Sequence, residues 1–263
     1  MKIMLWNVNG LRAILKKNNI NGNQTFIEFI SHINPDILCL NETKLSTLNQ
    51  DNRHENILQE YMYHTYTIST IKKGYSGVAI YSKYKHIKTH KEFDDDEGRC
   101  ICLEYNEFIL INVYVPNASI QLKRNEFKHR WMTNFINNIN KLKQISDKPI
   151  LIAGDFNCAV DDIDVFNPSK HHNSPGFTDI ERYDHRKLLD IGFTDPYRHK
   201  NIDEVIYTYF DKKSKAYSRN HGWYIDKILI SSEDIDIINN YSIIDVYGPS
   251  DHIPLMIDIN KFE

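Results

Sequence analysis

The chain has 263 residues, of which 41% are hydrophobic, and its 32 Lys and Arg against 35 Asp and Glu leave a formal charge of −3. This length and composition allow a sizeable core without disulfides, and the charge balance argues neither for nor against a polyanionic partner. The four cysteines have neither zinc-ligand spacing nor the density of a disulfide scaffold, and no apolar run is long enough to span a membrane. The sequence therefore predicts an intracellular protein with reduced thiols, and leaves nucleus and cytoplasm open.

Short runs rich in β-branched residues recur along the whole chain and predict strands. In chain order they are KIMLW, DILCL, GVAIYS, CICLEY, FILINVYV, PILIAGDF, IDKILIS, NNYSIIDV and PLMIDI. Several of these runs are continuously apolar, which is typical of strands covered on both faces. Cys100 and Cys102 alternate along one run, so we expect their side chains on the same face.

Three segments show helical spacing of apolar residues. The first extends from Gln24 to Ile33 and the second from Leu122 to Leu142. The second carries a stripe of large apolar residues that we expect in the core: Phe127, Trp131, Phe135, Ile139 and Leu142. The third extends from Thr178 to Leu189, and Glu181, three residues after Thr178, predicts a capping box.

The organisation of the chain indicates a single domain over residues 1–263. No repeat is present, and no Pro/Gly/Ser-rich linker separates two halves. Strands and helices interleave to the end, which favours an α/β domain of two packed sheets with helices outside. The segments 46–73 and 161–177 are predicted as long loops, which in a compact domain are usually functional or mobile.

Polar residues gather at the ends of the predicted strands, where α/β folds build their sites. They are Asn7, Asn9, Glu42, Tyr114, Asn117, Asp155, Asn157, Trp223, Asp226, Asp251 and His252. Each has an ordinary explanation when taken alone, such as a turn cap or a surface acid. Six such places together indicate one site.

The residue types in this set suit hydrolysis of a phosphodiester, which needs a metal, a base for water and donors for the developing charge. Glu42 and Asp251 offer carboxylates to Mg²⁺. Asp226 is suited to orient the imidazole of His252. The chain has no glycine-rich phosphate loop and no zinc motif, which disfavours those two chemistries.

The remaining members of the set offer a base and neutral hydrogen-bond donors. Asp155 can accept a proton from water, with Asn157 holding that water or the phosphate. Neutral donors are supplied by Tyr114, Asn7 and Asn117. The general base stays open at this point, with Asp155 favoured over Tyr114 and His252.

Seven motifs follow one another between Ile3 and Ile257: LWNVNGLRA, NETK, VYVPNA, GDFN, PGFTDIER, GWYIDKILIS and GPSDHIP. Together they resemble the exonuclease III-type apurinic/apyrimidinic (AP) endonucleases. These belong to the endonuclease/exonuclease/phosphatase superfamily, which includes pancreatic deoxyribonuclease. The elements NGLRA, YVPNA, GFTDIER and Gly-Trp-x-x-Asp resemble the abasic-site branch itself, whereas the others occur across the superfamily.

The resemblance implies a deoxyribonuclease-like α/β fold, a four-layer αββα sandwich of two mixed sheets flanked by helices. It implies a monomer that acts on duplex DNA with abasic sites and depends on Mg²⁺, with Mn²⁺ as the alternative ion. Cleavage 5′ to the abasic site would leave a 3′-hydroxyl, and 3′-exonuclease or 3′-end-cleaning activity would accompany it.

The resemblance also implies roles for individual residues. Glu42 matches the main metal ligand, Asp251 a carboxylate near the metal, and Asn9 a position where many members have Asp. The catalytic positions are matched by Asp155, which activates water, by the pair Asp226 and His252, and by Asn7, Asn157 and Tyr114, which orient or contact the phosphate. Asn117 matches a substrate-binding residue that contacts the phosphate.

A second group of residues matches the substrate pocket of the family. Tyr209, Trp223 and Ile225 fall on positions that enclose the flipped-out abasic sugar, and many members have Phe where this chain has Tyr209. From the loop NPSKHHNSPGFT only Asn173 and Ser174 are carried over. The segment DKKSKAYSRN would present Lys212, Lys213, Lys215 and Arg219 to DNA.

Two alternatives remain open from the sequence. One is a phosphoesterase of the same superfamily that acts on phosphoinositides, sphingomyelin or RNA tails. The other is a catalytically silent DNA-binding protein on the same fold.

Overall fold

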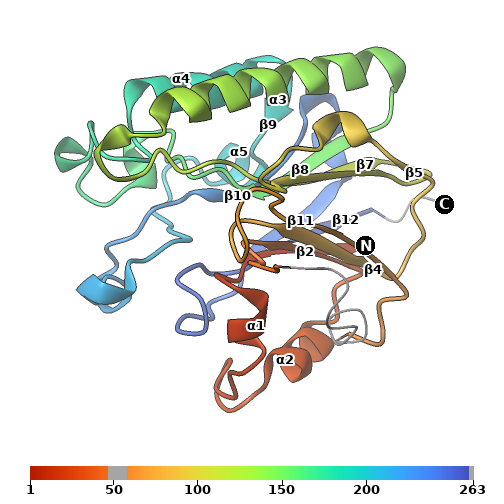
Figure 1. The fold of residues 1–263 in the computed structure, drawn as a ribbon, viewed down its shortest axis with the longest axis horizontal. Helices are drawn as coiled ribbons and strands as arrows, with labels where there is room; N and C mark the ends of the chain where they lie inside the picture. The colour runs from red at the N-terminus through yellow and green to blue at the C-terminus, as the bar shows by residue number, and fades with distance from the viewer. Residues whose placement is uncertain (47–57, 261–263) are drawn as a thin grey trace.

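The computed structural model describes residues 1–46 and 58–260. Its strands form two six-stranded sheets that pack face to face between two layers of helices (Figure 1). This confirms the predicted αββα sandwich. Within the described residues, no helix is both long and apolar enough to cross a membrane.

The first sheet contains the two ends of the chain. In spatial order its strands are β11 (Ile238–Ile243), β12 (Leu255–Ile259), β1 (Lys2–Asn7), β2 (Ile37–Asn41), β4 (Val78–Ser82) and β3 (Tyr63–Thr67). Strands β1 and β2 are parallel, and all other neighbours in this sheet are antiparallel.

The second sheet repeats the same sequence of strand directions. Its order is β5 (Lys88–Thr89), β6 (Cys100–Glu104), β7 (Ile109–Tyr114), β8 (Ile150–Asp155), β10 (Asp226–Ser231) and β9 (Phe193–Thr194). Here β7 and β8 form the one parallel pair. Each sheet therefore has a central parallel pair whose two carboxyl ends lie side by side.

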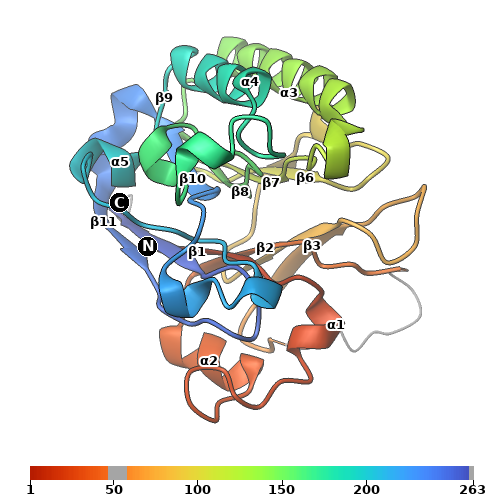
Figure 2. The same cartoon turned by 90° about the vertical axis from the view of Figure 1, so that its left-hand side faces the viewer.

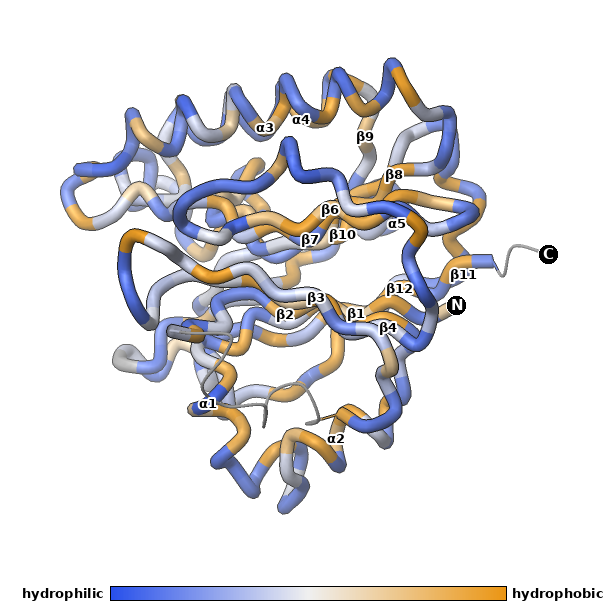
Figure 3. Tube along the Cα trace, turned by 45° about the vertical axis from the view of Figure 1, so that its right-hand side comes forward, coloured by the Kyte–Doolittle hydropathy of each residue, from blue (hydrophilic) through white to orange (hydrophobic). Residues whose placement is uncertain are grey.

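Helices cover the outer face of each sheet (Figures 1 and 2). Helices α1 (Leu11–Ile14) and α2 (Phe26–Ile33) lie against the first sheet, and α3 (Asn125–Ile145) and α4 (Asp179–Asp190) lie against the second. The short α5 (Pro196–Lys200) lies near β10 and β11. The hydrophobic residues gather between these layers (Figure 3).

The three predicted helices exist, and two begin later than expected: α2 begins at Phe26 and not at Gln24, and α3 begins three residues late. The capping box of Thr178 and Glu181 at the start of α4 is confirmed. Helix α3 begins at Asn125 and not at Leu122, because Gln121 and Leu122 have φ of +59° and +57°, which no right-handed helix can contain.

The predicted stripe along α3 is buried only in part. Phe135, Ile139 and Leu142 lie in the core, whereas Phe127 and Trp131 are half-buried. The buried face also includes Lys128 and two apolar residues of the same helix, Met132 and Ile136. The core side of α3 is therefore rotated slightly from the predicted stripe. Cys100 and Cys102 share the face toward α3, as predicted.

The predicted long loop 46–73 was wrong in part, because it contains strand β3. This edge strand reads YHTYT and is only half-buried, so it lacks the apolar signal of the central strands. Residues 47–57 of the same segment lie outside the described part of the chain. The second predicted loop, 161–177, contains only two 3₁₀ turns, Asp162–Asp164 and Pro168–Lys170.

Candidate active site

A cleft of about 710 Å³ opens where the carboxyl ends of the two parallel pairs meet. Twelve of the predicted site residues line it: Asn9, Glu42, Tyr114, Asn117, Asp155, Asn157, Ser174, Tyr209, Trp223, Ile225, Asp251 and His252. Asn7 and Asp226 are buried directly behind the lining. Asn173 is exposed and lies outside the residues that line the cleft.

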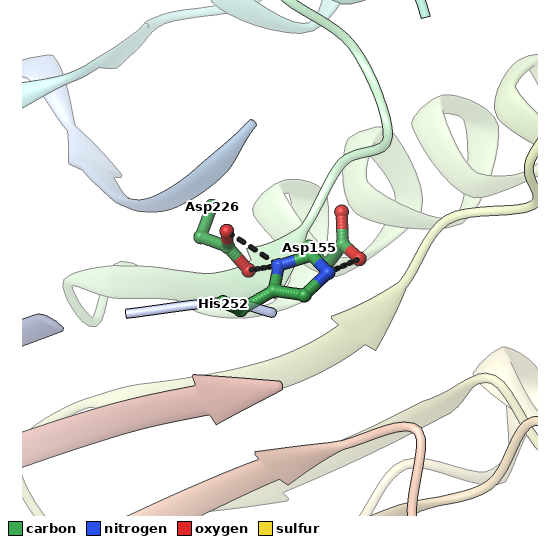
Figure 4. A group of neighbouring side chains, drawn as sticks. All are labelled: Asp155, Asp226 and His252. Carbon is green, nitrogen blue, oxygen red and sulfur yellow. Dashed lines mark hydrogen bonds and ion pairs between the residues drawn. The ribbon is translucent and has the colours of Figure 1, made fainter. Parts of the chain in front are cut away.

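The buried floor of the cleft is a line of two carboxylates with an imidazole between them (Figure 4). Nδ1 of His252 donates to Asp226 and lies 2.8 Å from Oδ2 and 3.1 Å from Oδ1. Nε2 of the same ring lies 3.9 Å from Oδ2 of Asp155. Since Asp226 fixes the ring through Nδ1, the Nε2–H faces Asp155 and the cleft.

The groups on this line shift one another's pKa values. Burial opposes the charge on His252, but Asp226 beside the ring, together with Asp155 and Asp251, raises the imidazole pKa to about 10. Burial, with Asp226 adding to it, raises the pKa of Asp155 to about 7. At neutral pH the site thus holds a charged imidazole beside a carboxylate that can readily take up a proton.

Asp155 is held by backbone and amide groups from both sheets. Its Oδ2 accepts from Nδ2 of Asn7 at 2.8 Å, and its Oδ1 accepts from the backbone N–H of Asn157 at 2.8 Å. Its own backbone N–H donates to Oδ1 of Asn41 at 2.8 Å, across the interface between the sheets. The carboxylate orientation is therefore set by the packing of one sheet on the other.

A second group of oxygen atoms lies at the other side of the cleft. Nδ2 of Asn9 donates to Oδ1 of Asp251 at 2.8 Å. The Lys44 ammonium lies 3.0 Å from Oε1 of Glu42 and also donates to Oδ1 of Asn9. Asn9 and Glu42 both have left-handed backbones, with φ of +48° and +56°, which a glutamate rarely adopts outside a functional site.

This oxygen group fits a hard divalent cation. Its donors are carboxylate and amide oxygens, the ligand types that Mg²⁺ prefers. A cation, the Lys44 ammonium, already lies against two of the three side chains. Burial opposes ionisation of Asp251, but charged His252 and the Asn9 amide outweigh it and hold the pKa of that carboxyl below its ordinary value.

The part of the chain that the structure describes contains one set of three His and Asp side chains close enough together to share an ion, Asp155, Asp226 and His252. Both nitrogens of His252, however, carry a proton when the ring is charged, so the imidazole has no lone pair for a metal. This set is better suited to moving protons, and the Glu42 side of the cleft to holding the metal.

Tyr114 is the last residue of β7, and its side chain, which packs against the Arg99 guanidinium, lines the cleft. The Arg99 guanidinium lies 4.8 Å from the centre of the Tyr114 ring, and its Nη1 donates to the Tyr114 carbonyl at 3.0 Å. Burial, with Glu42 and Asp155 adding to it, raises the pKa of Tyr114 well above its ordinary value. The phenol therefore stays protonated and can donate to an anion.

Two asparagines continue the polar wall from Tyr114 toward the pocket. Nδ2 of Asn117 donates to Oδ1 of Asn157 at 2.8 Å, and Nδ2 of Asn157 donates to the Val115 carbonyl at 2.9 Å. The turn after β8 brings Asn157 inward through a left-handed backbone, with φ of +49°. Both amides thus lie beside Asp155 and Tyr114.

The opposite wall of the cleft is aromatic. The Tyr209 ring lies 4.9 Å from the His252 ring, between centroids, and its backbone N–H and carbonyl pair with those of Trp223 at 2.9 Å. Ile225 is buried beside them in a cluster with Phe177. Apolar rings and a charged imidazole therefore face one another across a short distance.

Several residues at the site received no role from the sequence. Lys44 and the buried Arg99 hold the oxygen group and Tyr114. Phe166 and His221 stack at 3.6 Å between ring centroids, and both line the cleft beyond Trp223. The motif NETK includes Lys44, but Arg99 follows the acidic run DDDEG and gave no signal of a buried position.

The sequence profile of the Endonuclease/Exonuclease/phosphatase family matches residues 4–252. An exodeoxyribonuclease from Bacillus subtilis is 37% identical over 266 aligned positions, which cover 99% of this chain and 100% of that protein. The DNA repair nuclease APEX1 of Danio rerio is 36% identical, over 97% of this chain and 81% of its own. The solved structure of an AP endonuclease from Archaeoglobus fulgidus is 27% identical, with a TM-score of 0.84 over 99% of this chain and 100% of that one.

Proposed function

The chain belongs to the endonuclease/exonuclease/phosphatase family as a nuclease of the exodeoxyribonuclease and AP endonuclease type, and from that premise we propose that it incises duplex DNA at abasic sites. The scissile bond is the phosphodiester 5′ to the abasic nucleotide, and the products carry a 3′-hydroxyl and a 5′-phosphate. The same centre removes nucleotides or blocking groups from 3′ ends. Mg²⁺ is the cofactor, and Mn²⁺ is the alternative ion.

One observation carries this proposal. The proton-handling line of Asp155, Asp226 and His252 and the oxygen group of Glu42, Asn9 and Asp251 border the same cleft as the aromatic wall around Trp223. A phosphate between the first two groups would have its neighbouring sugar against the third. This arrangement supports phosphodiester hydrolysis next to a nucleotide that lacks its base.

The chemistry assigned to the residues follows from their protonation. Asp155 accepts a proton from a water molecule as the water oxygen forms a bond to phosphorus. The bond from phosphorus to the 3′-oxygen breaks, and that oxygen takes a proton from solvent to become the 3′-hydroxyl. Charged His252 donates its Nε2–H to a phosphate oxygen, and Asp226 holds the ring in that orientation. The phenol of Tyr114 and the amides of Asn7, Asn117 and Asn157 orient the phosphate or its neighbours.

The metal would be held by Glu42 and Asp251, with Asn9 contributing its side-chain oxygen. When bound, the ion supplies Lewis-acid polarisation of the phosphate and neutralises developing charge. A cation held there would compete with the Lys44 ammonium for Glu42 and Asn9.

The aromatic wall is proposed to select the abasic nucleotide. Tyr209, Trp223 and Ile225 enclose the flipped-out sugar, and extrusion of a nucleotide without a base costs less than extrusion of a paired one. Ser174 borders this wall, and the assignment of Asn173 to DNA contact stays a prediction. The basic residues Lys212, Lys213, Lys215 and Arg219 are proposed to meet phosphates next to the cleft.

The proposal is tested with a labelled duplex that carries one tetrahydrofuran abasic analogue. We expect a single incision 5′ to the analogue in Mg²⁺, suppression by EDTA, and recovery with added Mg²⁺ or Mn²⁺. A DNA polymerase should extend the product directly, which identifies a 3′-hydroxyl. Glu42→Gln should remove the incision while binding to the duplex in EDTA persists.

The matched control is the same duplex with a normal nucleotide in place of the analogue. An intact protein that binds the abasic duplex but leaves it uncut in both metals would contradict the proposal. Turnover of an inositol phosphate or sphingomyelin in a parallel assay, without DNA cleavage, would instead favour another branch of the superfamily.

A further inference from the structure

A buried ion pair connects two helices directly behind the cleft. Lys128 on α3 and Glu181 on α4 are 2% exposed each, and Nζ lies 2.7 Å from Oε1. No sequence signal gives Lys128 a role, and the sequence pattern assigns Glu181 only to the capping box. Neither side chain lines the cleft.

The lysine end of the pair holds the loop that carries the catalytic amide. Nζ of Lys128 also donates to the backbone carbonyl of Asn157 at 2.7 Å. The backbone N–H of Asn157 donates to Asp155 at 2.8 Å, and its side chain accepts from Asn117. The position of the Asn157 backbone therefore sets two groups on the phosphate side of the cleft.

The glutamate end holds the loop beneath the aromatic wall. The backbone N–H of Gly176 donates to both carboxylate oxygens of Glu181, at 3.0 Å each. A Cβ on Gly176 would lie 3.2 Å from the Asn157 carbonyl and 3.5 Å from the Trp223 ring, so this loop lies tightly between the two. Gly176 also lines the cleft.

These contacts form one continuous connection from the phosphate side of the cleft to the pocket wall. It passes from the Asn157 carbonyl through Lys128 and Glu181 to Gly176, which packs against Trp223. Stability alone does not account for the ion pair, because an apolar pair of the same volume is often as stable as a buried salt bridge. An apolar pair could not donate to the carbonyl or accept from the amide.

We propose that Lys128 and Glu181 are positioning residues, which fix the distance between the hydrolytic groups at Asn157 and the pocket wall at Trp223. The inference rests on the proposed function, since it needs a substrate that meets both sides of the cleft at once. Without the pair, the abasic nucleotide still binds but the phosphate is held out of line with Asp155 and His252.

The decisive variant is the double substitution Lys128→Met with Glu181→Gln. It leaves no unpaired buried charge, and glutamine at this position still completes the capping box with Thr178. We expect single-turnover incision of the tetrahydrofuran duplex to slow by roughly 10-fold to 100-fold, because small misplacements of reacting groups have effects of this size. The Kd of the uncut duplex in EDTA should change by less than about threefold, which marks a loss confined to the transition state.

Three matched variants separate positioning from stability. Thr178→Ala weakens the same helix end but keeps the ion pair, so it should lower the free energy of unfolding and leave the rate of the folded protein unchanged. Arg130→Met removes the exposed ion pair with Glu126 on α3 and should change neither. Lys128→Arg keeps the charge and both donors, so it should recover most of the rate.

The outcomes are distinct. A wild-type protein that leaves the duplex uncut removes the proposed function and, with it, the premise of this inference. A wild-type protein that cuts, beside a folded double variant that cuts equally fast, overturns the positioning role alone. That role is also overturned if Thr178→Ala slows incision as much as the double variant does at equal folded fraction.

Discussion

At the scale of single residues, the site combines groups whose charges depend on their neighbours. His252 is charged because Asp226 supports it, and Asp155 is a better base because burial and Asp226 raise its pKa. Tyr114 stays a phenol because it is buried near Glu42 and Asp155. Substitution of one carboxylate should therefore change the protonation of more than one group in the site.

Asp226→Asn should show this dependence most clearly. The amide is nearly isosteric but neutral, so it neither stabilises the charge on His252 nor fixes which nitrogen carries the proton. We expect the incision rate to fall by roughly 10²-fold to 10⁴-fold, as for other carboxylate–histidine pairs. Single-turnover incision measures the loss, and Asp236→Asn, an exposed site on the 3₁₀ turn Ser232–Ile237, is the control. A change of less than tenfold would argue against an imidazolium at the phosphate.

Tyr209 is the residue that the resemblance predicts to stand where many members of the family have phenylalanine. Its ring packs on His252, and burial, with Asp251 and other acids adding to it, raises the hydroxyl pKa to about 12. We expect Tyr209→Phe to keep abasic incision within about threefold of wild type, since the ring is retained. Tyr209→Ala should instead reduce the preference for the abasic duplex over the intact one. Equal preference in all three proteins would remove Tyr209 from the pocket.

At the scale of elements, the site depends on close contact between β7 and β8. Both strands deliver a site residue at their carboxyl ends, Tyr114 and Asp155, and these two positions are paired in the parallel register. Gly154 lies next to Asp155, and its absent side chain leaves room for the neighbouring strand. Glycine at position 154 thus allows β7 to approach closely beside the Asp155 carboxylate.

Gly154→Ala should destabilise the second sheet. The new Cβ would lie 2.3 Å from the Val113 carbonyl oxygen and 2.5 Å from its Cγ1, so β7 or β8 must shift. We expect urea unfolding to show a loss of about 2 to 3 kcal/mol, typical of overpacking in a close-packed interior. Gly22→Ala is the control, because nothing lies within 4 Å of it and only its positive φ opposes alanine, at about 1 kcal/mol. Equal losses in the two variants would contradict the steric explanation.

The sequence predicted the elements whose signals are local. The central strands are continuously apolar because both of their faces are covered. The start of α4 is indicated by the capping-box residues Thr178 and Glu181. The edge strand β3 was not predicted because its half-buried residues are tyrosine, histidine and threonine, without an apolar run. The late start of α3 was not predicted, because the positive φ of Leu122 is imposed by the preceding loop and not by its residue type.

Some residues of the candidate site could likewise be predicted from the sequence, and others could not. Asp155, Asp226 and His252 were predicted together, and the structure brings them into contact. Their assignment to proton chemistry came from their residue types and from the resemblance, and stays a prediction. The support provided by Lys128 and Arg99 could not be predicted, because a buried cation is recognised only when the partners that surround it are known.

At the scale of the whole molecule, polar groups connect the two sheets as well as the elements within them. Asn41 donates to Asn112 at 2.7 Å, and Asn112 donates to the Ala79 carbonyl at 2.8 Å, inside the otherwise apolar interface. With Asn41 also bound to Asp155, the site is continuous with the interior. Conditions that loosen the packing of the core should therefore also change the arrangement of the residues in the cleft.

The pH dependence of unfolding should reveal one such buried group, His185. Neither ring nitrogen has a partner, and burial, with Lys227 and Lys128 adding to it, lowers the pKa well below its ordinary value. Below about pH 6.5, His185 takes up a proton in the unfolded chain but not in the folded chain. The free energy of unfolding therefore falls as pH falls through that range.

The measurement compares the wild type with His185→Met by urea unfolding from pH 7.5 to pH 5. All other titrating groups are common to the two proteins, so the difference isolates His185. We expect the free energy of unfolding of the variant, relative to that of the wild type, to rise by up to about 1.4 kcal/mol for each pH unit below pH 6.5. A constant difference across the range would mean that the folded protein accepts the proton.

The first and last strands of the structure lie side by side, and this pairing orders events during biosynthesis. Strand β1 pairs with β12, and Trp6 donates to the His252 carbonyl at 3.0 Å. A growing chain that has not yet reached His252 lacks the imidazole, and β1 then has only one of its two neighbouring strands, β2. The line of two carboxylates and an imidazole at the floor of the cleft is therefore complete only after this late segment has been made and has docked against β1.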